Sequence, residues 1–357
     1  MKRKLSVLIA LTMVLALFTA CGGDSDDGLP LVGISMPTQS SERWIVDGNT
    51  LSNILIERGF DVDLQFAEDS IPTQRQQIED MLEKGAKVLV IAAVDGSTLS
   101  GVLNQAASDG VSVISYDRLL VDTAAVAYYA TFDNVKVGEL QAQSLIEGLR
   151  EKRGPGPWNI ELFAGSPDDT NSFFFFSGAM SVLQPYIDSG EITVRSGQTS
   201  QDQIGTLRWD GAVAQTRMDA VLAAHYNDGT PLHGVLSPYD GLSRGIISSF
   251  ISFGFQPGTD DWPIVTGQDA EAASISLIRT GEQYSTVLKD TRDLAGVAAD
   301  MVETVLGGRE PTINDTTTYH NNIKFVPSYL LVPYTVDIDN YRQLVIESGY
   351  LSEDDIN

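Results

Sequence analysis

Carboxylates, an amide and four phenylalanines lie side by side at residues 166–176, which read SPDDTNSFFFF. Soluble proteins normally keep ionised carboxylates in water and phenyl rings in the core. A sugar requires both groups at one place, because its hydroxyls donate and accept hydrogen bonds while the C–H faces of its ring are apolar and pack on flat aromatic rings. This segment is therefore a candidate for one side of a carbohydrate site.

The four rings cannot all face one ligand, because we expect a helix from Thr170 to Ile187. Phe173 and Phe176 are three residues apart and share one face of that helix. A stripe of phenylalanines on a helix is usually core packing, and Phe174 and Phe175 point elsewhere. We expect Phe175 to face the ligand, with Phe173 as the next candidate.

Other predicted strands end in similar residues, and ligands of open α/β sheets bind outside the carboxyl ends of the strands. A single Asp or Asn after a strand is equally well explained as a helix N-cap. This alternative applies to Asp240, which precedes a helix expected from Gly241. The same chemistry at several strand ends favours a shared site. The candidates at the other strand ends are Arg43, Trp44, Asp117, Arg118, Asp240, Gln268, Asp269 and Lys289.

The elements that must position these residues alternate between strand and helix, which predicts parallel sheets with helices on both faces. AKVLVIAAV (86–94) is a continuous apolar run, as expected of a strand buried on both faces. The segment KRGPGPW (152–158) interrupts the alternation, and the pattern then restarts, which indicates two α/β lobes. The expected helices span 42–58, 71–84, 97–109, 134–149, 170–187, 211–224, 241–253 and 291–306.

Length and charge fit a two-lobed protein of this kind. A chain of 357 residues suits about two domains. A net charge of −25 argues against a nucleic-acid partner, which needs a clustered basic surface. The three histidines, His225, His233 and His320, are scattered without metal-ligand spacing, so we expect no metal and no cofactor.

The first twenty residues have a basic start, an apolar run and small residues at the end, which is typical of a secretory signal peptide over residues 1–20. The only cysteine, Cys21, follows directly, and residues 18–21 resemble the lipobox of bacterial lipoproteins. We therefore expect cleavage before Cys21, a lipid on that cysteine and a flexible tether over residues 21–30. The mature protein is then extracytoplasmic and anchored to the cell membrane by its lipid alone.

From Leu31 to Tyr350 the chain resembles the periplasmic sugar-binding proteins of ABC importers, type I, and within them the multiple-sugar and D-xylose receptors. The stretches that carry the resemblance include VGISMPTQSSERW, QIEDMLEKGAKVLVIAAVDG, SPYDGLS and TGQDAE. The resemblance implies two Rossmann-like α/β lobes with parallel sheets, joined by a three-segment hinge. It implies a first lobe of residues 31–132 and 290–325, a second lobe of 134–288 and 330–357, and crossings near 132–134, 288–290 and 326–329.

The resemblance also implies which residues touch the sugar. The implied first-lobe and hinge contacts are Arg43, Trp44, Asp117, Arg118 and Lys289. The implied second-lobe contacts are Asn171, Phe175, Arg208 and Asp240. Further candidates are Phe173, Trp209, Gln268 and Asp269.

The expected function is capture of an aldose monosaccharide between the lobes and its delivery to the permease of an ABC importer, by a monomer that is not an enzyme. One alternative is a receptor that presents sugar occupancy to a membrane sensor kinase or a chemoreceptor, with the same fold and site. A hydrolase would need two carboxylates, such as Asp117 and Asp240. Donors such as Arg118 beside them keep carboxylates ionised, which suits binding rather than acid catalysis.

Overall fold

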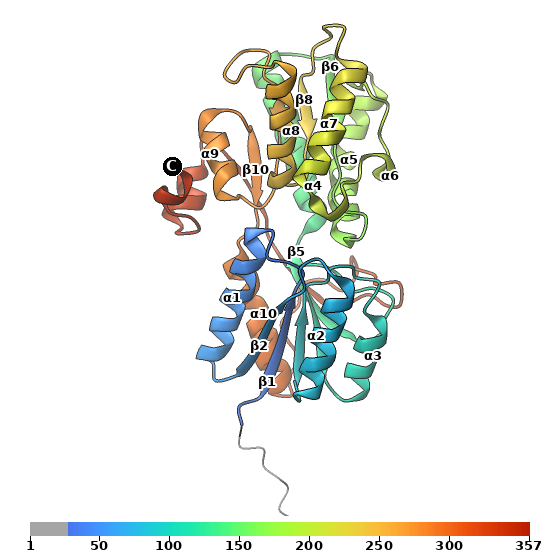
Figure 1. Ribbon diagram of the computed structural model, residues 1–357, viewed down its shortest axis with the longest axis vertical. Coiled ribbons are helices and arrows are strands. Elements are labelled where there is room, and N and C mark those ends of the chain that lie inside the picture. The colour runs from blue at the N-terminus through green and yellow to red at the C-terminus, as the bar shows by residue number, and fades with distance from the viewer. Residues whose placement is uncertain (1–27) are drawn as a thin grey trace, which may run out of the picture.

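The computed structural model describes residues 28–357, which form two lobes stacked along the long axis of the molecule (Figure 1). The expected signal peptide, Cys21 and most of the expected tether lie outside the described residues. No helix within residues 28–357 is both long and apolar enough to cross a membrane.

The first lobe is built on a six-stranded sheet with strand order β11-β5-β4-β3-β1-β2, in which all neighbours are parallel. Strand β3 is wholly buried, because α1 and α10 cover one face of the sheet while α2 and α3 cover the other. The predicted sheet with helices on both faces is thus confirmed. Its elements are β1 (Leu31–Met36), α1 (Glu42–Glu57), β2 (Asp61–Phe66), α2 (Ile71–Glu83), β3 (Val88–Ile91), α3 (Ser100–Ser108), β4 (Ser112–Tyr116), β5 (Val126–Phe132), α10 (Thr291–Leu306) and β11 (Ser328–Leu331).

The second lobe repeats this arrangement on a four-stranded parallel sheet with strand order β7-β6-β8-β9. Helices α4 and α5 pack on one face, and α7 and α8 on the other. The larger elements are α4 (Asn134–Arg153), β6 (Trp158–Leu162), α5 (Thr170–Asp188), β7 (Ile192–Val194), α7 (Gly211–His225), β8 (Gly234–Leu236), α8 (Asp240–Phe253) and β9 (Ile264–Val265). Short helices lie at Gln201–Ile204 (α6) and Leu207–Trp209 (η1).

A separate antiparallel pair, β10 (Ser285–Leu288) and β12 (Tyr334–Asp337), lies beside the second lobe, where the sequence predicted β10 only as one more strand of the alternating pattern. It packs on α9 (Ala272–Thr280) and on the last part of the chain. That part holds a π-helix at Arg342–Glu347 (η2) and a 3-10 helix at Glu353–Ile356 (η3).

Three segments connect the lobes, and the third differs from expectation. Strand β11 pairs with β5 and so completes the first sheet, while β12 pairs with β10. The crossing therefore lies between Leu331 and Tyr334, not near 326–329. The reason is that Tyr329 and Leu331 pack on the first-lobe core, so the segment expected to cross is held in the first lobe.

Most expected helices match the structure within a few residues, and two ends differ more. Helix α4 continues to Arg153, because the strong stop signals come only with Gly154, which adopts a φ of 70°, and the proline after it. Helix α3 begins at Ser100, since the chain turns at residues 96–97, where the Asp95 carboxylate accepts from the Ser97 amide at 2.9 Å.

Helices α4 and α5 cross so closely that their backbones touch. A Cβ atom on Gly138 would lie 1.9 Å from the carbonyl oxygen of Phe175, and one on Gly178 would lie 2.0 Å from that of Val135. Because helices without side chains at the crossing can approach this closely, the N-terminal turn of α5 is fixed against the start of α4. That turn carries the residues of the SPDDTN segment.

Gly138→Ala should destabilise the protein by about 1–3 kcal/mol, because the added methyl group meets backbone that cannot rotate away. Gly101→Ala is the matched control, since this helical glycine has no atom near the added Cβ. The control should gain up to about 1 kcal/mol from helix propensity. Urea unfolding measures both changes, and equal values for the two variants would contradict the close crossing.

Candidate functional site

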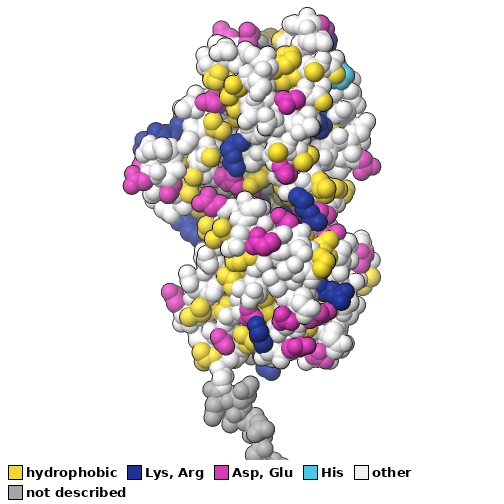
Figure 2. Space-filling model, viewed as in Figure 1, with side chains coloured by type: hydrophobic (Ala, Val, Ile, Leu, Met, Phe, Trp, Pro, Cys, Tyr) yellow, Lys and Arg dark blue, Asp and Glu magenta, His cyan; other side chains and the backbone are white. Residues whose placement is uncertain are grey.

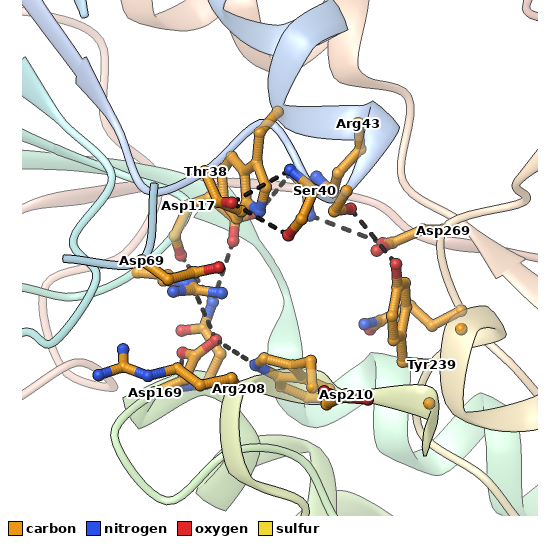
Figure 3. Close-up of a pocket in the computed structure, with 18 of the residues that line it drawn as sticks. Thr38, Ser40, Arg43, Asp69, Asp117, Asp169, Arg208, Asp210, Tyr239 and Asp269 are labelled. Carbon is orange, nitrogen blue, oxygen red and sulfur yellow. Dashed lines mark hydrogen bonds and ion pairs between the residues drawn. The ribbon is translucent and has the colours of Figure 1, made fainter. Parts of the chain in front are cut away.

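The lobes enclose a cavity of about 530 Å³, a size typical of small-molecule sites. Charged side chains of both signs gather at the waist between the lobes (Figure 2). Arg43, Asp117, Asp169, Tyr239 and Asp269 all line the cavity, and the view into it shows them around one space (Figure 3). They follow strands of both lobes, so the carboxyl ends of both sheets meet here, as the sequence predicts for a ligand site.

Asp117 lies in the first-lobe wall directly after β4, in a left-handed backbone conformation with φ of 57°. Its carbonyl oxygen accepts hydrogen bonds from Tyr129 Oη, from Thr131 Oγ1 at 2.9 Å and from Asn171 Nδ2 at 2.7 Å. Strain of this kind persists only where surrounding contacts over-determine it, and it concentrates at binding sites. The backbone at Asp117 is therefore held from both lobes, and this determines where its carboxylate lies.

Arg43 is the main partner of that carboxylate. Its Nη2 lies 2.9 Å from Asp117 Oδ2, and its Nε donates to Asp47 Oδ2 at 3.0 Å. Burial alone would raise the pKa of Asp117, but the charges of Arg43, Lys289 and Arg118 outweigh burial and hold the pKa below its ordinary value. Asp117 is thus an ionised hydrogen-bond acceptor at neutral pH.

Lys289 joins the two walls from the second hinge crossing. Its Nζ lies 3.1 Å from Asp269 Oδ1 and 3.8 Å from Asp117 Oδ2. Arg43 Nη1 lies 3.6 Å from the same Asp269 oxygen. Arg43 and Lys289 therefore share the carboxylates of Asp47 and Asp117 in the first lobe and of Asp269 in the second. No group of three or more His, Cys, Asp or Glu in residues 28–357 is placed to hold a metal ion.

The second-lobe wall is aromatic. The ring of Trp209 makes edge contacts with Phe175 at 6.2 Å and with Tyr239 at 6.0 Å between centroids. Its Nε1 donates to Asp169 Oδ2 at 3.1 Å. A Cβ on Gly165 would lie 1.9 Å from the Trp209 ring, so only glycine leaves room for the ring in this position. Phe175 and Trp209 thus offer apolar surface beside charged groups.

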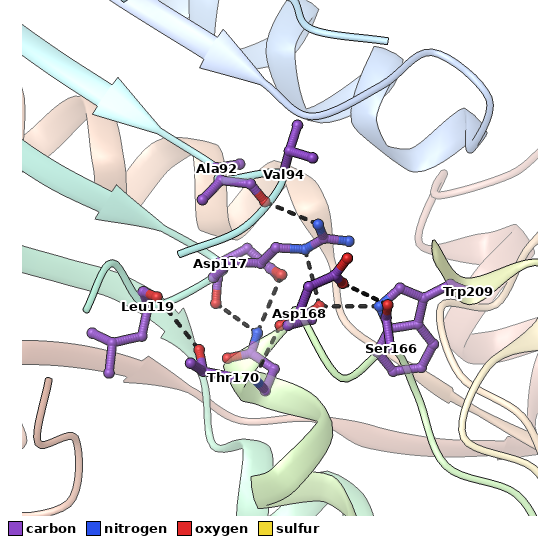
Figure 4. Close-up of polar contacts among 12 residues, drawn as sticks. Ala92, Val94, Asp117, Leu119, Ser166, Asp168, Thr170 and Trp209 are labelled. Atoms are coloured by element: carbon purple, nitrogen blue, oxygen red, sulfur yellow. Dashed lines mark hydrogen bonds and ion pairs between the residues drawn. The ribbon is translucent and has the colours of Figure 1, made fainter. Parts of the chain in front are cut away.

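Several polar contacts cross directly between the lobes (Figure 4). Thr170 Oγ1 donates to the carbonyl oxygen of Leu119 at 3.4 Å, and Arg118 Nε lies 3.0 Å from Asp169 Oδ2. Burial raises the pKa of Asp169, and the charge of Arg118 opposes that rise. Arg208 Nη1 reaches the carbonyl oxygen of Val94 at 3.4 Å. The observed arrangement is therefore one in which the lobes are closed on each other.

One acceptor atom in the wall, the buried Gln268 Oε1, has no hydrogen-bond donor among the described residues. The neighbouring Asp269 Oδ1 has only its ion-pair contacts with Lys289 and Arg43. A buried acceptor without a donor costs about 1–3 kcal/mol. A ligand that donates hydrogen bonds would remove this cost.

Eleven of the thirteen candidate residues line the cavity. They are Arg43, Trp44, Asp117, Arg118, Asn171, Phe175, Arg208, Trp209, Gln268, Asp269 and Lys289. Two of these side chains also make contacts within the protein that do not depend on a ligand. Trp44 belongs to the first-lobe core and carries the Arg43 guanidinium over its ring at 4.5 Å, while the Asn171 amide accepts from Tyr129 Oη at 3.0 Å.

Asp240 and Phe173 do not line the cavity. Asp240 is fully buried, and its carboxylate accepts hydrogen bonds from within the second lobe, so it faces away from the cleft. The N-cap alternative is wrong as well, because Tyr239 occupies the cap position of α8 and Asp240 is its first residue. Phe173 is 48% exposed on the outer side of α5, since the neighbouring rings fill the core positions.

Sequence reasoning missed other residues of the wall. Asp169 lies in the quoted SPDDTN segment, and its place before a helix could have identified it. Tyr239 follows a predicted strand and directly precedes Asp240, which does not line the cavity. Its hydroxyl lies 3.3 Å from Ser41 Oγ of the first lobe and donates to Glu271 Oε1 at 2.6 Å. The remaining lining residues are Thr38, Ser40, Ser41, Asp69, Asp210, Gly211, Gly241 and Arg244.

Comparison with known proteins places this fold and cleft in one family. A family model described as a periplasmic binding protein domain matches residues 32–310. The chain is 53% identical over 356 residues to a multiple sugar-binding periplasmic receptor, ChvE, of Rhizobium radiobacter, with 100% of each chain covered. It is 33% identical over 325 residues to a D-xylose-binding periplasmic protein of Escherichia coli K12, with 91% and 92% covered.

A solved structure shows the same architecture. An ABC transporter solute binding protein from Clostridium phytofermentans, with bound β-D-glucose, has a TM-score of 0.87 and 43% identity to this chain. The match covers 92% of this chain and 100% of the other. The chain therefore belongs to the periplasmic binding protein family, with the type I arrangement of two lobes around a cleft.

Gly165→Ala should displace the Trp209 ring and cost about 1–3 kcal/mol of unfolding free energy, because the ring is enclosed by Phe175, Tyr239 and Asp169. The same change in a Trp209→Ala background should cost far less, since the ring atoms that the new methyl group would meet are absent. Urea unfolding of the four proteins in this cycle gives the coupling. Additive effects would show that the glycine does not serve the ring.

Proposed function

We propose that this protein captures an aldose monosaccharide in the interlobe cleft and delivers it to the permease of an ABC importer. The observation that carries the proposal is a wall that combines aromatic surface with compensated charges and a buried acceptor, Gln268 Oε1, that lacks a hydrogen-bond donor. The relatives and the solved structure described above carry names that refer to sugars, which supports the proposal.

The balance of charge favours an uncharged ligand. Arg43 lies against Asp47 and Asp117, Lys289 lies against Asp269, and Arg118 lies against Asp169, so each of these cations already has a carboxylate partner. An anionic ligand would find no unpaired cation among these residues, and an uncompensated buried charge costs several kcal/mol. A sugar hydroxyl both donates and accepts, so it fits between such pairs without adding charge.

Each lobe supplies a different part of the cavity wall, and this division explains why a ligand favours closure of the lobes. Arg43, Asp117 and Trp44 come from the first lobe, whereas Phe175, Trp209 and Gln268 come from the second. A ligand can contact all of them only when the lobes are closed, so binding shifts the population towards the closed form. We propose that the permease recognises this closed form.

The proposal extends to location and partners. Cys21 after a signal-like segment supports a lipid anchor on the outer side of the cytoplasmic membrane. We also propose that the protein acts as a monomer, because the two lobes of one chain supply opposite walls of the cleft. The word receptor in the name of one relative supports, as a second role, presentation of the loaded form to a membrane sensor.

A thermal-shift screen of glucose, galactose, arabinose and xylose should find stabilisation by at least one aldose. Gln268→Leu should weaken binding of that aldose by about tenfold, because a buried hydrogen bond of roughly 1.4 kcal/mol is lost. Gln76→Leu on the exposed side of α2 is the control and should bind normally. Absence of any stabilisation by these sugars in the wild type would refute the sugar proposal.

Cys21→Ser should release the protein from membranes into the soluble fraction of cells without changing its sugar affinity. The reason is that one thioether-linked lipid group at this cysteine would be the only attachment. Fractionation followed by immunoblotting measures the distribution, with the wild type as reference. A variant that stays in the membrane fraction would rule out the anchor.

A further inference from the structure

Asp240 is a fully buried carboxylate behind the second-lobe wall, and neither the cleft nor a helix cap uses it. It forms no ion pair among the residues that the structure describes. Burial, followed by the nearby charge of Glu271, raises its pKa to about 8. The charge of Arg244 in α8 also interacts with it. Such a group is costly to keep, so its contacts call for an explanation.

Those contacts connect three segments of the second lobe. Asp240 Oδ2 accepts from the Glu271 amide at 2.9 Å. Its Oδ1 accepts from Gln283 Nε2 and from Thr286 Oγ1, both at 2.8 Å. The Asp240 amide donates to the carbonyl oxygen of Gln268 at 3.0 Å. One residue at the start of α8 thus holds the loop 267–271 and strand β10 together.

The loop 267–271 needs this support. Asp269 and Ala270 have φ of 94° and 53°, conformations that cost residues other than glycine about 1–3 kcal/mol each. Gly267 packs directly on the carboxylate, because a Cβ there would lie 2.1 Å from Asp240 Oδ1. Thr286 Oγ1, which donates to Asp240, also accepts from the Ala270 amide at 3.2 Å. The strained loop is therefore bracketed on both sides by the Asp240 contacts.

The same loop carries two acceptors of the cleft wall, Gln268 Oε1, which lacks a donor, and Asp269 Oδ1. Asp269 also contacts Lys289 at 3.1 Å, one residue beyond the end of β10. A small rotation of the loop would move both acceptors relative to the first-lobe wall. Asp240, which lies behind the wall and does not touch the ligand, therefore determines where these two acceptors meet the ligand's hydroxyls.

We infer that Asp240 is a positioning residue that fixes Gln268 and Asp269 in the cleft and thereby sets affinity and selectivity among sugar epimers. This inference rests on the proposed sugar function. It differs from a purely structural role, because the effect of Asp240 on binding should pass through Gln268.

Asp240→Ala should weaken binding of the preferred aldose by about tenfold. It should also reduce selectivity, so that the ratio of the affinities for that aldose and for its epimers moves closer to one. In a Gln268→Leu background the same change should have little further effect on affinity. Calorimetric titration of the four proteins gives this cycle. Affinity like that of the wild type, or full additivity with Gln268→Leu, would overturn the inference.

Glu161→Ala is the matched control. Glu161 is also a fully buried carboxylate of the second lobe, but its partners are Ser196 and Tyr226, which do not line the cleft. This variant should lose stability and keep its affinity and epimer selectivity. An equal loss of affinity in both variants would make the Asp240 effect a general consequence of destabilisation and would overturn the inference.

Two further measurements keep the test decisive. If Asp240→Ala does not fold, Thr286→Val removes one of the same contacts with little change in shape and should give the same non-additivity with Gln268→Leu. Amide hydrogen exchange without ligand should be faster over residues 268–271 in Asp240→Ala than in Glu161→Ala. A wild type that binds no aldose would refute the sugar function alone, whereas unchanged exchange in this loop would refute the positioning role.

Discussion

The rest of the structure depends on the compensation of buried charges in the cleft. Arg43 and Asp117 come from the first lobe, Asp269 from the second, and Lys289 from the segment between them. Unpaired, each of these ions would cost several kcal/mol in a site this enclosed. The closed lobes bring the partners together, so the charges that line the binding surface also favour closure. The strained backbone at Asp117 and Asp269 is tolerated because it places these carboxylates correctly.

Close contacts at glycines, which have no side chain, support this arrangement from the second lobe. Gly138 and Gly178 allow α4 and α5 to touch, which fixes the start of α5 and with it Asp169, Asn171 and Phe175. Gly165 provides the space in which Trp209 lies. Ion pairs therefore hold the charged groups of the first lobe and the loop 267–271, whereas close packing positions Trp209 and the start of α5.

The sequence was informative about the lobes and the strand ends, because alternation and buried runs such as Val88–Ile91 depend on local pattern. It was less informative about which way an individual side chain points. Tyr239 and Asp240 are neighbours, yet only the first lines the cleft, since the start of α8 turns the second into the lobe. The third crossing was misplaced for a related reason. Whether residues 328–331 cross or pair with β5 depends on long-range hydrogen bonds that no local pattern reports.

The pairing of β11 with β5 also has a consequence for how the chain reaches its native state. The first sheet is complete only with Ser328–Leu331, and one of its faces is covered by α10 (Thr291–Leu306). A growing chain that has emerged as far as the whole second-lobe sheet still lacks an edge strand and a covering helix of the lobe that it began. Contacts so far apart in the sequence form slowly. The sheet that begins first is therefore completed only after the whole second sheet has been made, and the second sheet can assemble while the first waits.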